Sequence, residues 1–172
     1  MRRMEPNGFE PVIVVGAGVG GLACARALHA AGRSVVVLER ARGVGGRCAT
    51  RRVEGVPMDF GPTFLHGRTP EFLEALAGVP AQAISGWPMV VAGQGQPCQP
   101  AAFTPGEQRF AFAEGVTAFP RHLAKGLDVR LEQRVTRMTF AGARVLLETE
   151  GGEEYQSSVV VRKKCSMRCK PL

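Results

Sequence analysis

The sequence predicts an α/β protein built around a parallel sheet, and three observations support this. The apolar, β-branched run Pro11–Val15 leads directly into the glycine-rich run Gly16–Gly21. A helical pattern over Leu22–Ala31 and a second apolar run, Ser34–Leu38, come next. Such apolar runs are typical of parallel strands buried on both faces. Short strands late in the chain, separated by glycine turns, predict an antiparallel meander packed on this sheet.

The first strand and helix are joined by the spacing Gly16-x-Gly18-x-x-Gly21. Gly16 permits a tight turn, Gly18 lets the backbone approach a pyrophosphate, and Gly21 lets the helix pack closely on the strand. Gly20 belongs to the same predicted binding turn. The helix N-terminus offers N–H groups and a positive dipole end to phosphates. A Rossmann-like, dinucleotide-binding βαβ unit is therefore predicted; the alternative is a glycine-rich turn in an unrelated α/β protein.

The second strand ends at Glu39, 23 residues after Gly16. A carboxylate at this position can accept hydrogen bonds from an adenosine ribose. Glu39 disfavours the 2′-phosphate of NADP, whereas the neighbouring Arg40 leaves NADP open. The fingerprint alone therefore does not separate NAD from FAD.

Cap residues predict the elements that follow. Arg40–Arg52 is expected to be a loop. A helix should begin after Thr69 as N-cap, with Pro70 and Glu71 in its first turn, and should end at Gly78.

The second half of the chain is expected to hold short elements. Gly86–Phe112 predicts short strands and loops, and Thr117–Gly126 predicts a helix capped by Thr117 with Pro120 in its first turn. Four strands should follow, of which the last three form the meander: Val129–Leu131, Val135–Phe140, Val145–Thr149 and Glu153–Val161.

Length and composition predict a cytoplasmic protein without a membrane span. The 172 residues suffice for one domain of ordinary size, and 45% of them are hydrophobic, enough to bury a core. No apolar run approaches the ~18 residues needed to cross a bilayer, and no signal peptide is recognisable.

Charge and cysteines argue against a nucleic-acid surface and a metal site. The net charge of +7 comes largely from the tail Arg162–Leu172, without which 17 basic residues face 15 acidic ones. A specific nucleic-acid partner is therefore not predicted. Five cysteines without a secretory signal predict reduced thiols. Cys165 and Cys169 have no further ligands nearby, so no metal site is predicted.

A second glycine motif, Arg42-Gly-Val-Gly45-Gly46-Arg47, follows the second strand. Adjacent glycines admit a ligand against the main chain, and Arg47 adds a planar cation suited to phosphate oxygens. At this point the sequence resembles the N-terminal portion of the FAD-dependent amine oxidoreductases, which include flavin amine oxidases, polyamine oxidases and renalase-like proteins. The stretches VIVVGAGVGGLACARAL, VLERARGVGGRCATRR and MDFGPTFLHG carry the resemblance. It implies that the cofactor is FAD.

The resemblance also implies roles for single residues. Asp59–Thr63 is similar to the segment that runs beneath the flavin, so Gly61 and Thr63 join the expected cofactor-binding residues. His66 in Phe-Leu-His-Gly is expected to face the substrate, although a loop histidine that caps or packs is the alternative. Val135 matches a position whose backbone contacts adenine.

The resemblance further implies a domain organisation. Residues 11–52 and 115–161 are expected to form the FAD-binding domain, and residues 53–114 part of a substrate or cap segment. After Val161 the basic tail 162–172 departs from the family pattern, which continues into a substrate domain and a segment that holds the flavin ring. This departure predicts a truncated or out-of-frame chain with doubtful activity on its own.

The predicted function is that of the FAD-binding part of an oxidoreductase that oxidises an amine, or a similar C–H or C–N substrate, by hydride transfer to flavin. The expected partner is a small amine-like molecule, and the sequence carries no signal for an oligomeric state. A non-enzymatic dinucleotide-binding fragment and an NAD(P)-binding oxidoreductase are the alternatives.

Overall fold

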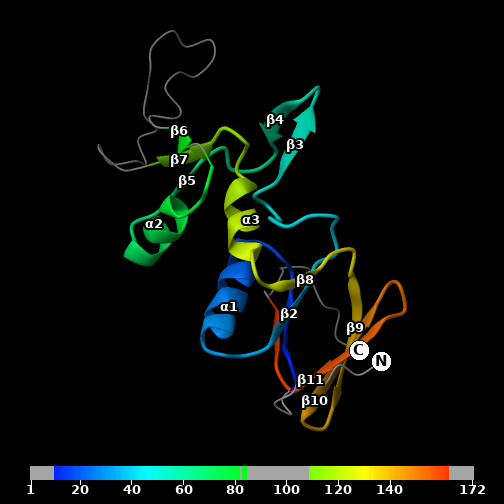
Figure 1. Ribbon diagram of the computed structural model, residues 1–172. Coiled ribbons are helices and arrows are strands. Elements are labelled where there is room, and N and C mark those ends of the chain that lie inside the picture. Colours follow the sequence, from blue (N-terminus) through cyan, green and yellow to red (C-terminus); the bar gives the residue numbers. More distant parts are fainter. Residues whose placement is uncertain (1–9, 82, 85–108, 163–172) are drawn as a thin grey trace. The chain divides into compact units, whose positions relative to one another are not determined.

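The computed structural model describes residues 10–81, 83–84 and 109–162, which fall into two compact units (Figure 1). The first unit contains residues 1–46 and 123–172, and the second contains residues 47–122. Cys165, Cys169 and most of the segment 86–112 lie outside the described residues. The predicted division into a cofactor domain and a substrate segment stays a prediction, because compactness assigns no function to either unit.

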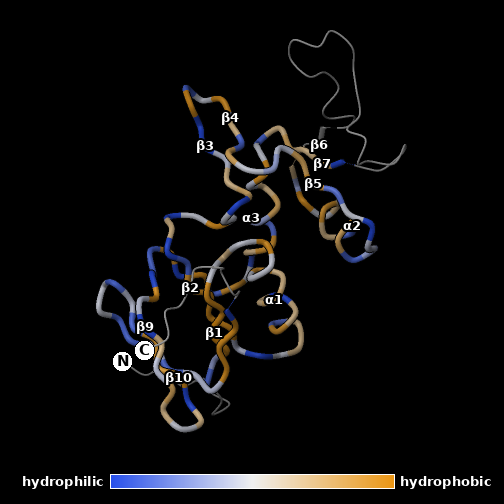
Figure 2. The backbone as a smooth tube through the Cα atoms, turned by 180° about the vertical axis from the view of Figure 1, so that it is seen from behind, coloured by the Kyte–Doolittle hydropathy of each residue, from blue (hydrophilic) through white to orange (hydrophobic). Residues whose placement is uncertain are grey.

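A parallel sheet forms the centre of the first unit, as predicted. Its strand order is β12-β1-β2-β8, and all three neighbouring pairs are parallel. The four strands are β1 (Val12–Val15), β2 (Val35–Leu38), β8 (Asp128–Arg130) and β12 (Val160–Arg162). All of β2 and most of β1 are buried, and the backbone tube in Figure 2 is coloured as hydrophobic along both strands.

The helix α1 (Val19–Ala30) connects β1 to β2 and lies beside them (Figure 1). It begins three residues earlier than predicted, because the last two glycines of the glycine motif form its first turn. Its end agrees with the prediction. Gly32 has a φ of 74°, and Arg33 N donates to Leu28 O at 3.0 Å, as in a Schellman motif.

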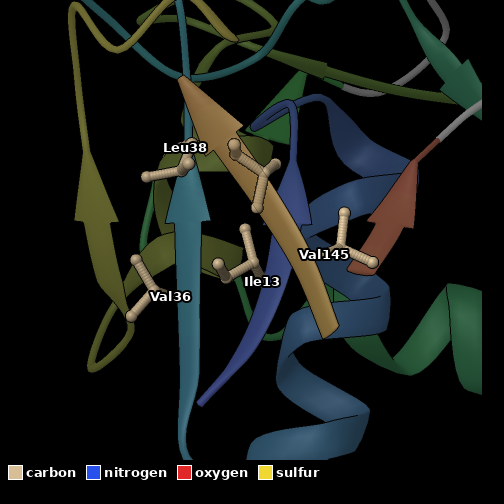
Figure 3. Close-up of a cluster of buried hydrophobic side chains, with 5 residues drawn as sticks. Ile13, Val36, Leu38 and Val145 are labelled. Carbon is tan, nitrogen blue, oxygen red and sulfur yellow. The ribbon is translucent and has the colours of Figure 1, made fainter. Parts of the chain in front are cut away.

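The meander consists of β9 (Val135–Ala141), β10 (Arg144–Thr149) and β11 (Glu154–Ser157), which are antiparallel in the order β11-β10-β9. It contributes to the core together with the parallel sheet. Figure 3 shows side chains of β1, β2 and β10 gathered in one cluster. The buried members of this cluster are Ile13, Val36, Leu38, Val145 and Leu147.

The prediction of one continuous last strand, Glu153–Val161, was wrong. The chain leaves the meander after Ser157 and joins the parallel sheet as β12, where Val160 pairs with Ile13. The hydroxyl of the buried Ser157 bonds to the backbone at this change of partner. It donates to Pro11 O at 2.7 Å and accepts the N–H of Val159 at 3.0 Å, so the chain is turned toward the start of β1.

The second unit begins with a hairpin, β3 (Thr50–Val53) and β4 (Val56–Asp59), where a loop was predicted as far as Arg52. The two strands are joined by Glu54 and Gly55, with φ values of 51° and 83°. Positive φ at both positions is typical of a type I′ hairpin turn. The small sheet β5-β7-β6 follows, from Leu65–His66, Arg109–Phe112 and Ala83–Ile84.

Both predicted later helices are present. The helix α2 (Pro70–Ala77) has Thr69 as N-cap and Gly78 as C-cap, but the Thr69 side chain makes no capping bond. The helix α3 (Ala118–Ala124) follows Thr117, whose hydroxyl bonds elsewhere in the unit. In the described part of the chain, no helix has the length and apolarity needed to cross a membrane.

Candidate dinucleotide site

The turn between β1 and α1 contains two glycines that the fold itself requires. Gly16 has a φ of 103°, a backbone conformation that residues with a side chain rarely adopt. A Cβ atom on Gly21 would overlap the carbonyl oxygen of Gly16. Gly21 therefore lets α1 pack closely on the strand, as the motif predicts.

The other two glycines of this turn have no such structural cause. A Cβ atom on Gly18 or Gly20 would meet nothing within 4 Å, and Gly18 has an ordinary φ of −75°. The N-terminus of α1 has no side-chain cap and no acidic residue in its first turn. The main chain at Gly18 and Gly20 is thus open to an anion beside unneutralised N–H groups.

Glu39 stands at the end of β2, where only 7% of it is exposed. Its Oε2 accepts the N–H of Ala17 at 2.7 Å, and its Oε1 accepts the N–H of Ala41 at 2.9 Å. An ionised carboxylate has about four acceptor positions, so two such bonds leave capacity for ribose hydroxyls. Arg40, beside it, is exposed.

The second glycine motif closes on the first. Gly45 N donates to Ala17 O at 2.8 Å, and Gly45 forms an isolated parallel bridge with Gly18. Gly46 has a φ of 58°, and a Cβ atom there would lie 3.3 Å from the Cα atom of Gly18. The structure therefore brings together two motifs that are about thirty residues apart.

The segment before β9 lies beside the end of β2. Gln133 N donates to Glu39 O at 2.8 Å, and Glu132 N donates to Ala41 O at 3.1 Å. Val135 begins β9 two residues later, and its half-buried side chain packs against the core cluster. The expected adenine-contacting backbone is thus close in sequence to residues hydrogen-bonded to the Glu39 loop.

The remaining predicted site residues lie in the second unit. Arg47, which directly follows Gly46, is exposed, as is Thr63. A Cβ atom on Gly61 would overlap the carbonyl oxygen of Arg47, so this glycine is needed for the local backbone.

His66 also lies in this unit, on β5 opposite Arg109 on β7, and it is exposed. Its ring centroid is 6.0 Å from that of Phe64, and the Arg109 guanidinium lies 5.9 Å from the Phe64 centroid. The structure thus places His66 in an aromatic and basic group.

Sequence reasoning missed a polar network that follows Arg47. Thr117 Oγ1 donates to Cys48 O at 3.0 Å and accepts the Thr50 N–H at 2.7 Å. Thr50 Oγ1 donates to Asp59 Oδ1 at 2.6 Å and accepts the Thr117 N–H at 3.1 Å. No sequence pattern reports a pairing between residues 67 positions apart.

Cys48 is buried within this part of the chain. Burial raises the pKa of its thiol, which the charge of Arg47 lowers and that of Asp59 raises further. A thiol in this state is a weak nucleophile, so its proximity to the glycine loop does not make it reactive.

Two family descriptions match the chain. Residues 14–77 match the NAD(P)-binding Rossmann-like domain, and residues 96–162 match the flavin containing amine oxidoreductases. The first match covers both glycine motifs, and the second covers α3, the meander and β12.

Named relatives share the similarity over part of their length. The chain is 50% identical over 79 residues to AofH of Mycobacterium tuberculosis, a protein named as a flavin-containing monoamine oxidase. It is also 50% identical over 56 residues to polyamine oxidase 4 of Oryza sativa. These matches cover 44% and 33% of this chain, but only 17% and 12% of the relatives.

Solved structures share the fold. Wild-type putrescine oxidase with bound putrescine matches with a TM-score of 0.67 at 15% identity, over 88% of this chain and 57% of its own. A fatty acid isomerase from P. acnes matches with a TM-score of 0.66 at 14% identity, over 89% of this chain and 58% of its own. Similar folds thus accompany different reactions, as is common.

Proposed function

We propose that this relative of the flavin-containing amine oxidoreductases is the FAD-binding part of an enzyme that removes a hydride from an amine or a similar C–H or C–N substrate. One observation carries the proposal: the Gly45 N–H donates to Ala17 O, so that two glycine loops meet at an uncapped helix N-terminus. When bound, FAD supplies the hydride acceptor, while the protein supplies binding, orientation and electrostatics.

The pyrophosphate would lie at the open main chain of Gly18 and Gly20, where N–H groups and the helix dipole favour negative charge. Glu39, already fixed by Ala17 and Ala41, would accept hydrogen bonds from the adenosine ribose. Arg40 is proposed to add positive charge at the same edge.

The second glycine loop and the segment before β9 would complete the adenosine and pyrophosphate half of the site. Gly46 would admit the ligand against the main chain, and Arg47 would pair with phosphate oxygens. Val135 is proposed to contact adenine through its backbone. Gly61 and Thr63 are proposed to lie near the flavin, and His66 to face the substrate.

An NAD(P)-binding function is the second candidate, because the first glycine region matches an NAD(P)-binding description. A buried carboxylate at Glu39 opposes the 2′-phosphate of NADP. Neither motif by itself separates NAD from FAD, so a direct comparison of ligands is required.

The experiment is calorimetric titration of the 172-residue protein with ADP, FAD, FMN, NAD⁺ and NADP⁺. We expect ADP and FAD to bind with similar affinity, because most of the proposed binding residues serve the adenosine and pyrophosphate half. FMN and NADP⁺ should bind far more weakly. Tightest binding of NAD⁺ or NADP⁺, or no binding of ADP and FAD, would refute the proposal. With bound FAD, bleaching of the flavin absorbance by an amine under anaerobic conditions tests the reaction itself.

Two arginines allow a matched test of the second glycine loop. Arg47→Ala should weaken FAD binding by about 1–3 kcal/mol, the scale of charge-assisted hydrogen bonds. Arg52 is another exposed arginine five residues later, and its guanidinium donates to Gly55 O at 3.2 Å within the hairpin. Arg52→Ala should leave FAD affinity within about twofold. Equal losses in the two variants would mean that only general positive charge matters.

Glu39→Ala tests the ribose assignment. It should weaken binding of ADP and FAD by about 1–3 kcal/mol. Because Glu39 also accepts the Ala17 and Ala41 N–H groups, the variant should unfold at lower urea concentration. Unchanged ADP and FAD affinity would remove Glu39 from the site.

A further inference from the structure

The hydroxyl group of Thr117 bonds to two successive peptide groups just after Arg47, the one between Cys48 and Ala49 and the one between Ala49 and Thr50. Thr117 Oγ1 donates to the carbonyl of Cys48 at 3.0 Å and accepts the N–H of Thr50 at 2.7 Å. Only 7% of Thr117 is exposed, so these bonds are shielded from competing water.

Contacts with Phe60 and Gly61 fix the same stretch of backbone. The Arg47 carbonyl lies so close to Gly61 that a Cβ atom there would overlap it. The Ala49 carbonyl accepts the N–H of Phe60 at 2.9 Å. The backbone from Arg47 to Thr50 is therefore held at successive carbonyl groups, while the Arg47 side chain is exposed.

We propose that Thr117 is a positioning residue for Arg47, fixing the backbone from which the guanidinium reaches the pyrophosphate of the dinucleotide. This inference rests on the proposed function. A long side chain on a fixed backbone has less freedom to lose when it binds than one on a moving backbone. A residue that acts only through Arg47 should lose its effect on affinity when the Arg47 side chain is removed.

A double-mutant cycle tests this dependence. FAD affinity is measured by calorimetry on the 172-residue wild type, Thr117→Val, Arg47→Ala and the double variant, and folding is checked by circular dichroism. Thr117→Val should weaken FAD binding about tenfold when Arg47 is present and less than about twofold when it is absent. Thr117→Ser keeps the hydroxyl and should retain FAD affinity within about twofold.

Thr149 provides the matched control for stability. It is a buried threonine of the first unit, and its hydroxyl accepts the Glu153 N–H at 3.1 Å. Thr149→Val removes an equivalent bond, so it should lower the unfolding midpoint as Thr117→Val does, yet leave FAD affinity unchanged.

The outcomes separate this inference from the proposed function. Equal losses of affinity from Thr117→Val with and without Arg47 would overturn the positioning role and leave FAD binding standing. Failure of the wild type to bind FAD and ADP would overturn both. If the valine variant does not fold, Thr117→Ala takes its place in the cycle, with the same expected and contradicting results.

Discussion

The glycines of the turn between β1 and α1 differ in the reason why a side chain is absent. Gly21 is small because the Gly16 carbonyl occupies the position where its Cβ atom would be. Gly18 has open space there and an ordinary φ. Packing therefore explains Gly21 but not Gly18, which is the glycine that we propose lies against the pyrophosphate.

This difference predicts opposite effects of two identical substitutions. Gly21→Ala should lower the free energy of unfolding by about 1–3 kcal/mol, the cost of overpacking. Gly18→Ala should leave stability unchanged or raise it by about 0.4–1 kcal/mol through the unfolded state. The same Gly18 variant should weaken ADP binding at least about tenfold, because its methyl group blocks the pyrophosphate. Urea unfolding and ADP titration measure both effects, and a Gly18 variant with normal ADP affinity would contradict the assignment.

A pH-dependent prediction concerns Cys48. Its pKa is raised by burial, so at pH 8 the folded protein should keep this thiol protonated while the half-buried Cys24 reacts with iodoacetamide. The raised pKa contributes stability that is present below the ordinary thiol pKa of about 8.5 and is lost as pH rises through the folded value. Labelling at Cys48 should therefore grow steeply only at higher pH, as measured by peptide mass spectrometry. A Cys48 labelling rate at pH 8 equal to that of the urea-unfolded protein would contradict this prediction.

At the scale of elements, we expect the hydroxyl of Ser157 to direct the last strand toward β1. Ser157→Ala removes the bonds to Pro11 O and Val159 N, so it should lower the free energy of unfolding by about 1–3 kcal/mol. Loss of hydrogen-exchange protection should concentrate in β12 and β1. Ser158→Ala, at the exposed neighbouring position, is the control. A uniform loss over all strands would argue against a specific role in directing β12.

The elements that sequence predicted well are those with local causes. The parallel strands follow from their apolar runs, and α1 and α2 follow from glycine and proline at their ends. The hairpin β3–β4 was missed because Arg51, Arg52 and Val53 are all exposed. The strand β3 therefore lacks the alternation of apolar and polar residues that predicts a half-buried strand. The split of the last strand was missed because it depends on contact between Ser157 and Pro11, 146 positions apart.

For the whole molecule, the first glycine motif and Glu39 were predicted from spacing, because a short turn and a following strand constrain them strongly. The second glycine motif was predicted from its adjacent glycines and from the family resemblance. The meeting of Gly45 with Ala17 and the contact of Thr117 with Cys48 needed the tertiary structure. Local spacing thus selects the residues that we propose bind the cofactor. Long-range contacts determine how firmly those residues are held, and such contacts leave no periodic pattern in the sequence.

The place of β12 beside β1 has a consequence for synthesis. The βαβ unit leaves the ribosome before β12, but one edge of β1 pairs with this later strand, which begins only at Val160. At translation rates of about 5–20 residues per second, the intervening chain takes roughly 7–30 s to appear. During that interval the nascent chain presents an unpaired, apolar edge, which is a template for wrong pairing with other chains. Cellular chaperones that shield such edges should therefore affect the yield of this protein more than its final stability.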